Sequence, residues 1–283
     1  MDLKMLVDTP PWEWPENAGK TIQTTLADRR ANEADRTTAA ELAGNLVVMN
    51  DGMADALMAI VNRDSEPEEL RARAAISLGP VLEEADLDGF DDDLSDPSIS
   101  EQTFNKIQSL LQKVYLNKDV PKQVRRRALE ASVRASQPWQ ENAIREAYAS
   151  GDREWILTAV FGMRWIPGFD DQILESLKTE DEEIHYEAVN AAGDREVVGA
   201  WDHVLKLVQD PKTPQLLLLA AIEAVAAIRP SEARHVLSYL VDSPDEEIAE
   251  AVDEALMMVE ARIQLESGED EDEEEEEKKD WVN

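Results

Sequence analysis

Apolar residues along this chain recur with the spacing of helices that bury one face. The clearest case is the segment 181–193, where Ile184, Ala188, Ala191 and Ala192 lie at offsets 0, +4, +7 and +8. These offsets fall on one side of an α-helix, and the small alanine at +4 allows a neighbouring helix to approach closely. Asp181 stands three residues before the first apolar position, where helix-capping residues are favoured. The segment is therefore predicted to be an amphipathic helix that begins near Asp181.

The same frame of positions occurs seven times along the chain. Its central +4 position is a small or apolar residue in every copy, namely Ala40, Ala74, Ala128, Ala159, Ala188, Ala221 and Val252. The copies follow one another at intervals of 29 to 34 residues, apart from one interval of 54. A second amphipathic stretch precedes each copy after the first, at 53–61, 104–114, 143–149, 172–177, 197–208 and 233–240. Neither helix of such a pair buries its apolar face alone, so the chain is predicted to be all-α, with about seven stacked helical hairpins.

Three segments fall outside the repeated frame. Residues 1–16 contain the Pro/Trp-rich stretch 9–15, which is predicted to cover the N-terminal end of the stack, because terminal repeats need atypical covers. The solenoid is predicted over 17–265, and its 54-residue interval contains an Asp-rich insertion at about 83–100. The remainder, 266–283, carries eleven acidic residues and is predicted to be a disordered tail.

The repeated frame resembles the second helix of HEAT repeats, including the phycobilin-lyase-like (PBS-lyase) bacterial branch, over about residues 17–262. The TPPWEWP segment near the start is similar to the opening of bacterial HEAT proteins. The resemblance implies a right-handed α-solenoid, with Arg71 and Asp181 at the positions that form a ladder between HEAT units. That ladder is incomplete, because the arginine position holds other residues in four copies: Ile156, His185, Leu218 and Ala249. Solenoids of this kind serve many partners, so the resemblance implies a fold and not one activity.

Composition narrows the classes of function. The chain has no cysteine, which excludes disulfides, thiolate metal sites and cysteine nucleophiles. The net charge of −34 argues against binding to nucleic acid or to anionic membranes, which normally requires a basic surface. The start of the chain lacks the apolar stretch of a signal peptide, and no run of about 18 apolar residues is present. We therefore expect a cytoplasmic protein.

The Asp-rich insertion contains candidate calcium ligands, Asp86, Asp88 and Asp92. Aligned on an EF-hand loop, the insertion matches at positions 3, 5 and 6. Position 1 is Glu84 instead of aspartate, and position 12 is Ser95 instead of glutamate. A solvated acidic loop is the preferred interpretation, and no metal or other cofactor is expected.

The motifs of several enzyme classes are absent or incomplete in this chain. HEAT-type deoxyhypusine hydroxylases carry His-Glu pairs, but none of the three histidines here precedes a glutamate. HEAT-like DNA glycosylases combine a basic face with tryptophans, as Trp155, Trp165 and Arg164 could suggest, yet the charge of the chain opposes this. No phosphate-binding glycine loop, G-x-S-x-G elbow or H-E-x-x-H helix is present. The sequence thus predicts that the protein is not an enzyme.

One set of positions stands out as a binding surface. Offsets +2, +3, +6 and +10 of the second helices are predicted to face the concave side of the solenoid. The selected residues there are basic, aromatic, polar or amide-bearing: Arg73, Arg126, Arg127, Glu130, Arg134, Thr158, Trp165, Tyr186, Glu187 and Asn190. Arginine, tryptophan and tyrosine are frequent interface anchors. The alternative is an ordinary solvated helix face with ion pairs within a helix, such as Arg126 with Glu130.

These observations favour a protein-binding scaffold or adaptor, which holds a protein or peptide segment in its concave groove and contains no catalytic residue. A monomer is favoured, although the sequence leaves the oligomeric state open. A second hypothesis comes only from the resemblance, namely a chaperone-like lyase, or a lyase subunit, that acts on a pigment-bearing protein.

Overall fold

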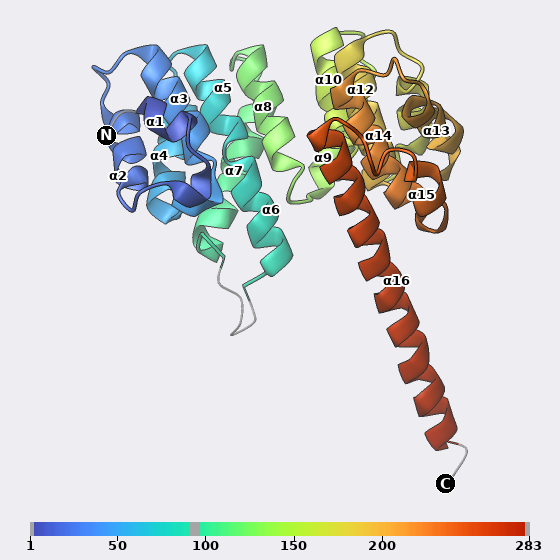
Figure 1. The fold of residues 1–283 in the computed structure, drawn as a ribbon. Helices are drawn as coiled ribbons and strands as arrows, with labels where there is room; N and C mark the ends of the chain where they lie inside the picture. The colour runs from blue at the N-terminus through green and yellow to red at the C-terminus, as the bar shows by residue number, and fades with distance from the viewer. Residues whose placement is uncertain (1–2, 91–96, 281–283) are drawn as a thin grey trace. The chain divides into compact units, whose positions relative to one another are not determined.

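The computed structural model describes residues 3–90 and 97–280, with side chains through residue 265, and all of its regular elements are helices. The chain divides into two compact units, 1–166 and 167–283 (Figure 1). The predicted all-α fold is confirmed within the described residues.

Unit 1 (1–166) contains four consecutive pairs of helices. A short helix α1 (Leu3–Val7) and the 3-10 turn η1 (Pro11–Glu13) precede them. The paired helices are α2 (Ala18–Ala27) with α3 (Glu33–Ala43), α4 (Asp51–Val61) with α5 (Glu68–Ile76), α7 (Glu101–Leu116) with α8 (Lys122–Ser132), and α9 (Pro138–Tyr148) with α10 (Arg153–Gly162). Two further elements lie between them, the 3-10 turn η2 (Leu46–Val48) and the helix α6 (Gly79–Asp88).

Unit 2 (167–283) contains three further pairs. These are α11 (Asp170–Ser176) with α12 (Glu182–Asp194), α13 (Trp201–Gln209) with α14 (Gln215–Ile228), and α15 (Pro230–Leu237) with α16 (Glu246–Asp280); the 3-10 turn η3 (Val198–Ala200) precedes α13. With the four pairs of unit 1, the described residues form seven helical hairpins. The predicted α-solenoid of about seven hairpins is therefore confirmed.

The second helices of successive pairs pack directly on one another within each unit. In unit 1, α3 contacts α5, α5 contacts α8, and α8 contacts α10; in unit 2, α12 contacts α14, and α14 contacts α16. The contact between α5 and α8 spans the long interval in the repeat, so the insertion leaves the stack of second helices unbroken.

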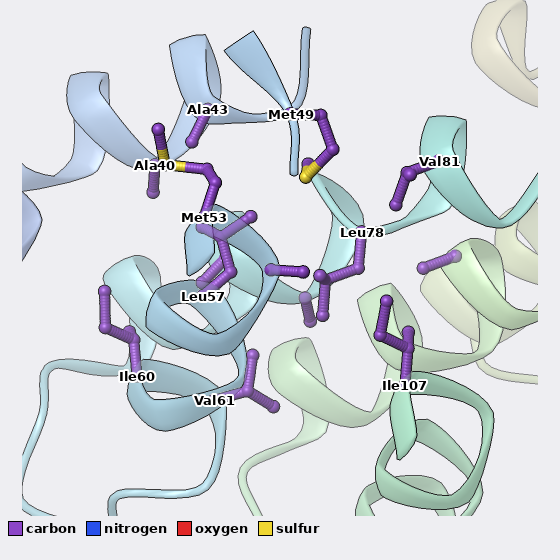
Figure 2. Packing of buried hydrophobic residues seen from close by; sticks show 14 of the residues in the cluster. Ala40, Ala43, Met49, Met53, Leu57, Ile60, Val61, Leu78, Val81 and Ile107 are labelled. Carbon is purple, nitrogen blue, oxygen red and sulfur yellow. The ribbon is translucent and has the colours of Figure 1, made fainter. Parts of the chain in front are cut away.

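Small residues at the +4 positions make this stacking close. The alanines at that position are fully buried in all six copies that carry one: Ala40, Ala74, Ala128, Ala159, Ala188 and Ala221. On α12, a Cβ at Gly193 would lie 3.0 Å from the Cα of Ala224 on α14, so these two backbones nearly touch. Longer apolar side chains, such as Met53, Leu57, Leu78 and Ile107, fill the layer between first and second helices in unit 1 (Figure 2).

Capping residues start several second helices, as the sequence predicts. The Asp152 carboxylate accepts from the backbone N–H of Glu154 at 3.0 Å and of Trp155 at 3.3 Å. Asp181 accepts from the backbone N–H of Ile184 at 3.2 Å. These bonds satisfy N–H groups that have no partner within the helix.

The N-terminal segment packs on the first hairpin. The indole Nε1 of Trp14 donates to the carbonyl oxygens of Leu6 at 3.0 Å and Thr9 at 2.9 Å, which closes the turn after α1. Leu6 is buried, and α1 contacts both α2 and α3.

Two segments have a secondary structure that the repeat frame does not give. The helix α16 continues through Asp280, where a disordered tail is predicted from residue 266. Glutamate and lysine are good helix formers, so a helix that starts on a packed repeat can extend through such a run. Asp86 and Asp88 lie in α6 and not in a calcium-binding loop, while Asp92 falls outside the described residues.

No helix among the described residues combines the length and the apolar composition that crossing a membrane requires.

Candidate functional site

Three arginines of unit 1 make the same backbone contact. Each lies in a second helix and donates from Nε to the carbonyl oxygen ten residues earlier, at the end of the preceding first helix. The bonds are Arg36 to Leu26 at 3.4 Å, Arg71 to Val61 at 3.1 Å and Arg125 to Tyr115 at 2.8 Å. The last carbonyls of a helix have no partner within it and carry partial negative charge, so a guanidinium at this place ties the two helices of a pair together.

A buried polar network joins α8 to α10. Arg126 donates from Nε to the Thr158 hydroxyl at 2.9 Å, and Thr158 donates to Glu130 at 2.6 Å. Glu130 also accepts from Arg127 at 2.5 Å, and the Arg126 guanidinium lies 3.4 Å from Glu154. Burial lowers the pKa of Arg126, and the carboxylates of Glu130 and Glu154 oppose this shift. The network satisfies these polar groups and holds one second helix against the next.

Four of the ten residues predicted for the binding surface are therefore buried. Arg126, Glu130 and Thr158 belong to the network between α8 and α10, and Asn190 is 8% exposed and donates to the Tyr186 carbonyl of its own helix. In α8, the flank of the second helix that carries Arg126 and Glu130 faces the next second helix and not solvent.

Three other predicted residues remain partly exposed in unit 1 without joining that network. Arg73 on α5 lies 3.8 Å from Glu41 and 4.0 Å from Glu69, which are distances of loose ion pairs. Arg134 follows α8 and Trp165 follows α10, and both are half-buried. Arg127 lies between these two groups of residues, because its side chain is 42% exposed but its guanidinium forms an ion pair with the buried Glu130.

Arg134 and Trp165 come together with a residue that the sequence reasoning did not select. Glu83 of α6 accepts from the Trp165 indole at 3.1 Å and forms an ion pair with Arg134. The Arg134 Cζ lies 4.8 Å from the Trp165 ring centroid. A Cβ at Gly79 would lie 2.8 Å from the Arg134 Cδ, so glycine makes room for the arginine. The helix α6 thus positions both predicted residues.

Two more side chains complete this group, which we call the Arg134–Trp165 cluster (Glu83, Arg134, Phe161, Arg164 and Trp165). Phe161 packs against Trp165 with ring centroids 4.9 Å apart, and the Arg164 Cζ lies 5.0 Å from the Trp165 centroid. Trp165 therefore contacts two guanidinium groups, an arrangement of cation–π contacts. Within the described residues, the Arg134 Nε is buried and has no hydrogen-bond partner.

An aromatic cavity lies at the other end of the α7–α8 hairpin and was missed by the sequence reasoning. Its volume is about 200 Å³, and its lining includes Tyr115, Lys118, Arg125, Glu146 and Trp155. The rings of Tyr115 and Trp155 meet edge to face at 6.1 Å, and the Arg125 Cζ lies 5.6 Å and 5.2 Å from their centroids. Burial raises the pKa of Tyr115, and Glu146 adds to that effect. Trp155 was considered only for a DNA-glycosylase surface, and Arg125 was not selected as a site residue.

In unit 2, the predicted residues Tyr186 and Glu187 lie half-buried on α12. The same helix carries His185, whose Nε2 lies 2.7 Å from the Nε2 of His203 on α13. Burial lowers the pKa of both histidines, and for His203 the nearby His185 and Lys206 add to the shift. Within the described residues, no group of three or more histidine and carboxylate side chains is arranged to hold a metal ion.

The chain was compared with known families, curated proteins and solved structures. No protein-family model matches this chain, and no curated protein matches it. Human deoxyhypusine hydroxylase in complex with glycerol aligns over 89% of this chain and 87% of its own, at 15% identity and a TM-score of 0.41. An engineered protein aligns over 87% of this chain and 98% of its own, at 16% identity and a TM-score of 0.34.

The prediction that this chain is not an enzyme is contradicted by the first of these structures, because that neighbour is an enzyme whose fold is similar. The correction has a physical reason, since helical repeats determine a framework and leave the chemistry of the surface open. A likeness at this identity brings no substrate, metal or catalytic residue to the present chain.

Proposed function

We propose that this HEAT-like protein binds a segment of another protein through the partly exposed residues of its second helices in unit 1. The observation that carries the proposal is that four predicted residues at the second helices stay partly exposed. Arg73 lies on α5 and Arg127 on α8, while Arg134 and Trp165 directly follow α8 and α10.

The chemistry of these residues supports the proposal. Arginine and tryptophan are enriched among the residues that contribute most to protein interfaces. The chain as a whole has a net charge of −34, so the arginines on this surface are opposite in sign to the net charge of the chain. Trp165 is held in place by Glu83 and by two arginines. Because its side chain is already ordered, less conformational entropy is lost when a partner binds. In unit 2, Tyr186 and Glu187 are proposed to serve in the same way on α12.

Site-specific photocrosslinking tests this proposal. A benzophenone amino acid is placed at Arg73, Arg127 or Trp165 in the full chain, which is expressed in its native host and irradiated. A matched control carries the same group at Asn105, an exposed position on the first helix α7. We expect one partner to be captured from all three positions of the second helices and not from position 105.

Capture of the same proteins from position 105, or of a different set from each position, would contradict a shared binding surface. Each variant is first checked by thermal melting, so that non-specific crosslinks from a partly unfolded protein are not mistaken for capture of a partner. Trp165 is the safest position for the probe, because one aromatic group replaces another.

A further inference from the structure

The terminal nitrogens of Arg125 lack the carboxylate that the equivalent arginines have. Arg36 forms two bonds to Glu66, at 2.5 Å and 3.1 Å, and Arg71 lies 3.1 Å from Asp64. All three arginines donate from Nε to the end of the preceding helix. Among the described residues, no carboxylate forms an ion pair with Arg125, although the chain contains 62 aspartates and glutamates.

For Arg71 and Arg125, the sequence explains this difference at a single position. Asp64 lies seven residues before Arg71, and Lys118 lies seven residues before Arg125. A cation thus stands at the place in the repeat where the other hairpin has its anion. Within the described part of the chain, Lys118 likewise has no ion pair, and its Nζ lies 5.8 Å from the Tyr115 ring centroid. Two cations that form no ion pair in the described structure therefore line one cavity, together with a single carboxylate, Glu146.

The cavity gives these cations apolar walls. Tyr115 is 5% exposed, and its ring packs against Trp139 at 5.3 Å and Trp155 at 6.1 Å. The Arg125 guanidinium is fixed by its bond to the Tyr115 carbonyl and by its position over two rings. A fixed planar guanidinium offers two parallel N–H groups, which match the two oxygens of a carboxylate. At about 200 Å³, the cavity suits a small molecule or a single side chain.

We infer that this cavity binds a small organic monocarboxylate, with its carboxylate on Arg125 and Lys118 and its apolar part against Tyr115 and Trp155. Glu146 also lines the cavity and forms no ion pair in the described structure. Its charge repels a dianion more strongly than a monoanion, so a carboxylate is preferred to inorganic phosphate. This site shares no residue with the proposed protein-binding surface and is independent of it.

NMR titration of the full chain tests this inference, with the indole N–H signals of Trp139 and Trp155 as reporters. Three probes are compared: benzoate, its uncharged analogue benzamide, and inorganic phosphate. We expect benzoate to shift both indole signals in a saturable way, and benzamide to bind at least about tenfold more weakly, the usual worth of a charge-assisted hydrogen bond. Equal binding of benzamide, stronger binding of phosphate, or no saturable shift with benzoate would overturn the inference.

The variant Lys118→Asp recreates the arrangement of Asp64 with Arg71. Its new carboxylate should occupy the Arg125 guanidinium and reduce benzoate affinity by at least about tenfold, with a melting temperature equal to or above that of the wild type. Lys113→Asp makes the same change of charge on the exposed side of α7 and should retain binding. Retention by Lys118→Asp, or equal losses in both variants, would show that the cations of this cavity do not bind the probe.

Discussion

The second helices of the two units are held together by different interactions. In unit 1, polar groups are buried between them: Arg126, Thr158 and Glu130 connect α8 to α10, and Arg36 reaches Glu66. In unit 2, the contact between α12 and α14 depends on small residues, with Gly193 against Ala224. The arginine of the repeat frame is replaced in unit 2 by His185, Leu218 and Ala249.

This difference has consequences for stability. A buried polar network is weakened greatly by the loss of one member, because the remaining charges lose their partners. Apolar contacts between small residues respond to added volume instead. The stability of unit 1 should therefore fall when a buried charged residue is removed or protonated. The stability of unit 2 should fall when a larger side chain replaces a small one, and only its histidine pair should respond to pH.

The largest effect is expected from Glu130→Ala. Glu130 is 3% exposed and bonds to Thr158 and Arg127, with Arg126 beside it. Its removal leaves the buried Arg126 without its buried carboxylate partner, and such a loss costs about 3–5 kcal/mol. Denaturant unfolding measures the change. Arg145→Ala is the control, since that exposed arginine on α9 should cost about 0.5 kcal/mol or less. Similar small losses in both variants would mean that the network adds nothing.

A second large effect concerns acid and the Arg36–Glu66 pair. The hydrogen bond from Arg36 lowers the pKa of Glu66 from 4.5 to about 2. Because the unfolded chain takes up this proton first, the stability from the pair is complete above pH 4.5 and is lost as pH falls toward 2. The loss amounts to about 3 kcal/mol in all. Glu66→Gln should remove that part of the acid sensitivity, and an unchanged pH profile of unfolding would contradict the assignment.

In unit 2, the histidine pair predicts a smaller dependence on pH. The pKa of both His185 and His203 is lowered, so the unfolded chain binds protons more readily below the ordinary value of 6.5. Stability should fall as pH drops through 6.5 toward the lowered values, where two protonated rings 2.7 Å apart would repel each other. His203→Gln should flatten this part of the profile, and His235→Gln, at an exposed position, should not.

The smallest effect is expected from Arg73→Ala. Its ion pairs are long and its side chain is 38% exposed, so the free energy of unfolding should change by about 0.5 kcal/mol or less. Thr158→Val is the matched comparison, because its buried hydroxyl bonds to both Arg126 and Glu130 and its loss should cost about 1–3 kcal/mol. A loss from Arg73→Ala as large as that from Thr158→Val would place Arg73 in the structural network.

Much of the fold could be predicted from periodicity. The +4 alanines, the helix starts at Asp152 and Asp181, and the seven hairpins all follow from a repeat frame that has a direct steric meaning. The continuation of α16 beyond residue 265 does not follow from this frame, because that run lacks apolar periodicity, although glutamate favours helix.

The candidate site was predictable only in part. Helical offsets separate the apolar stripe from the other faces of a helix. They do not distinguish a face that contacts the next second helix from a face that is open to solvent. Arg126 and Arg127 are adjacent in sequence and differ for this reason, with side chains that are 3% and 42% exposed. Glu83 was out of reach, because its contacts with Arg134 and Trp165 span 51 and 82 residues. Lys118 could have been found from the sequence, because it lies seven residues before Arg125, as Asp64 lies seven residues before Arg71.

The most direct test of the central claim is a calorimetric titration of the captured partner segment into the wild type and Arg73→Ala. The account predicts that the variant unfolds like the wild type and binds with an affinity reduced by about 2 kcal/mol, or roughly 30-fold. Asn105→Ala on α7 should bind as the wild type does. Equal affinity in all three proteins would contradict the claim that the partly exposed residues of the second helices form the binding surface.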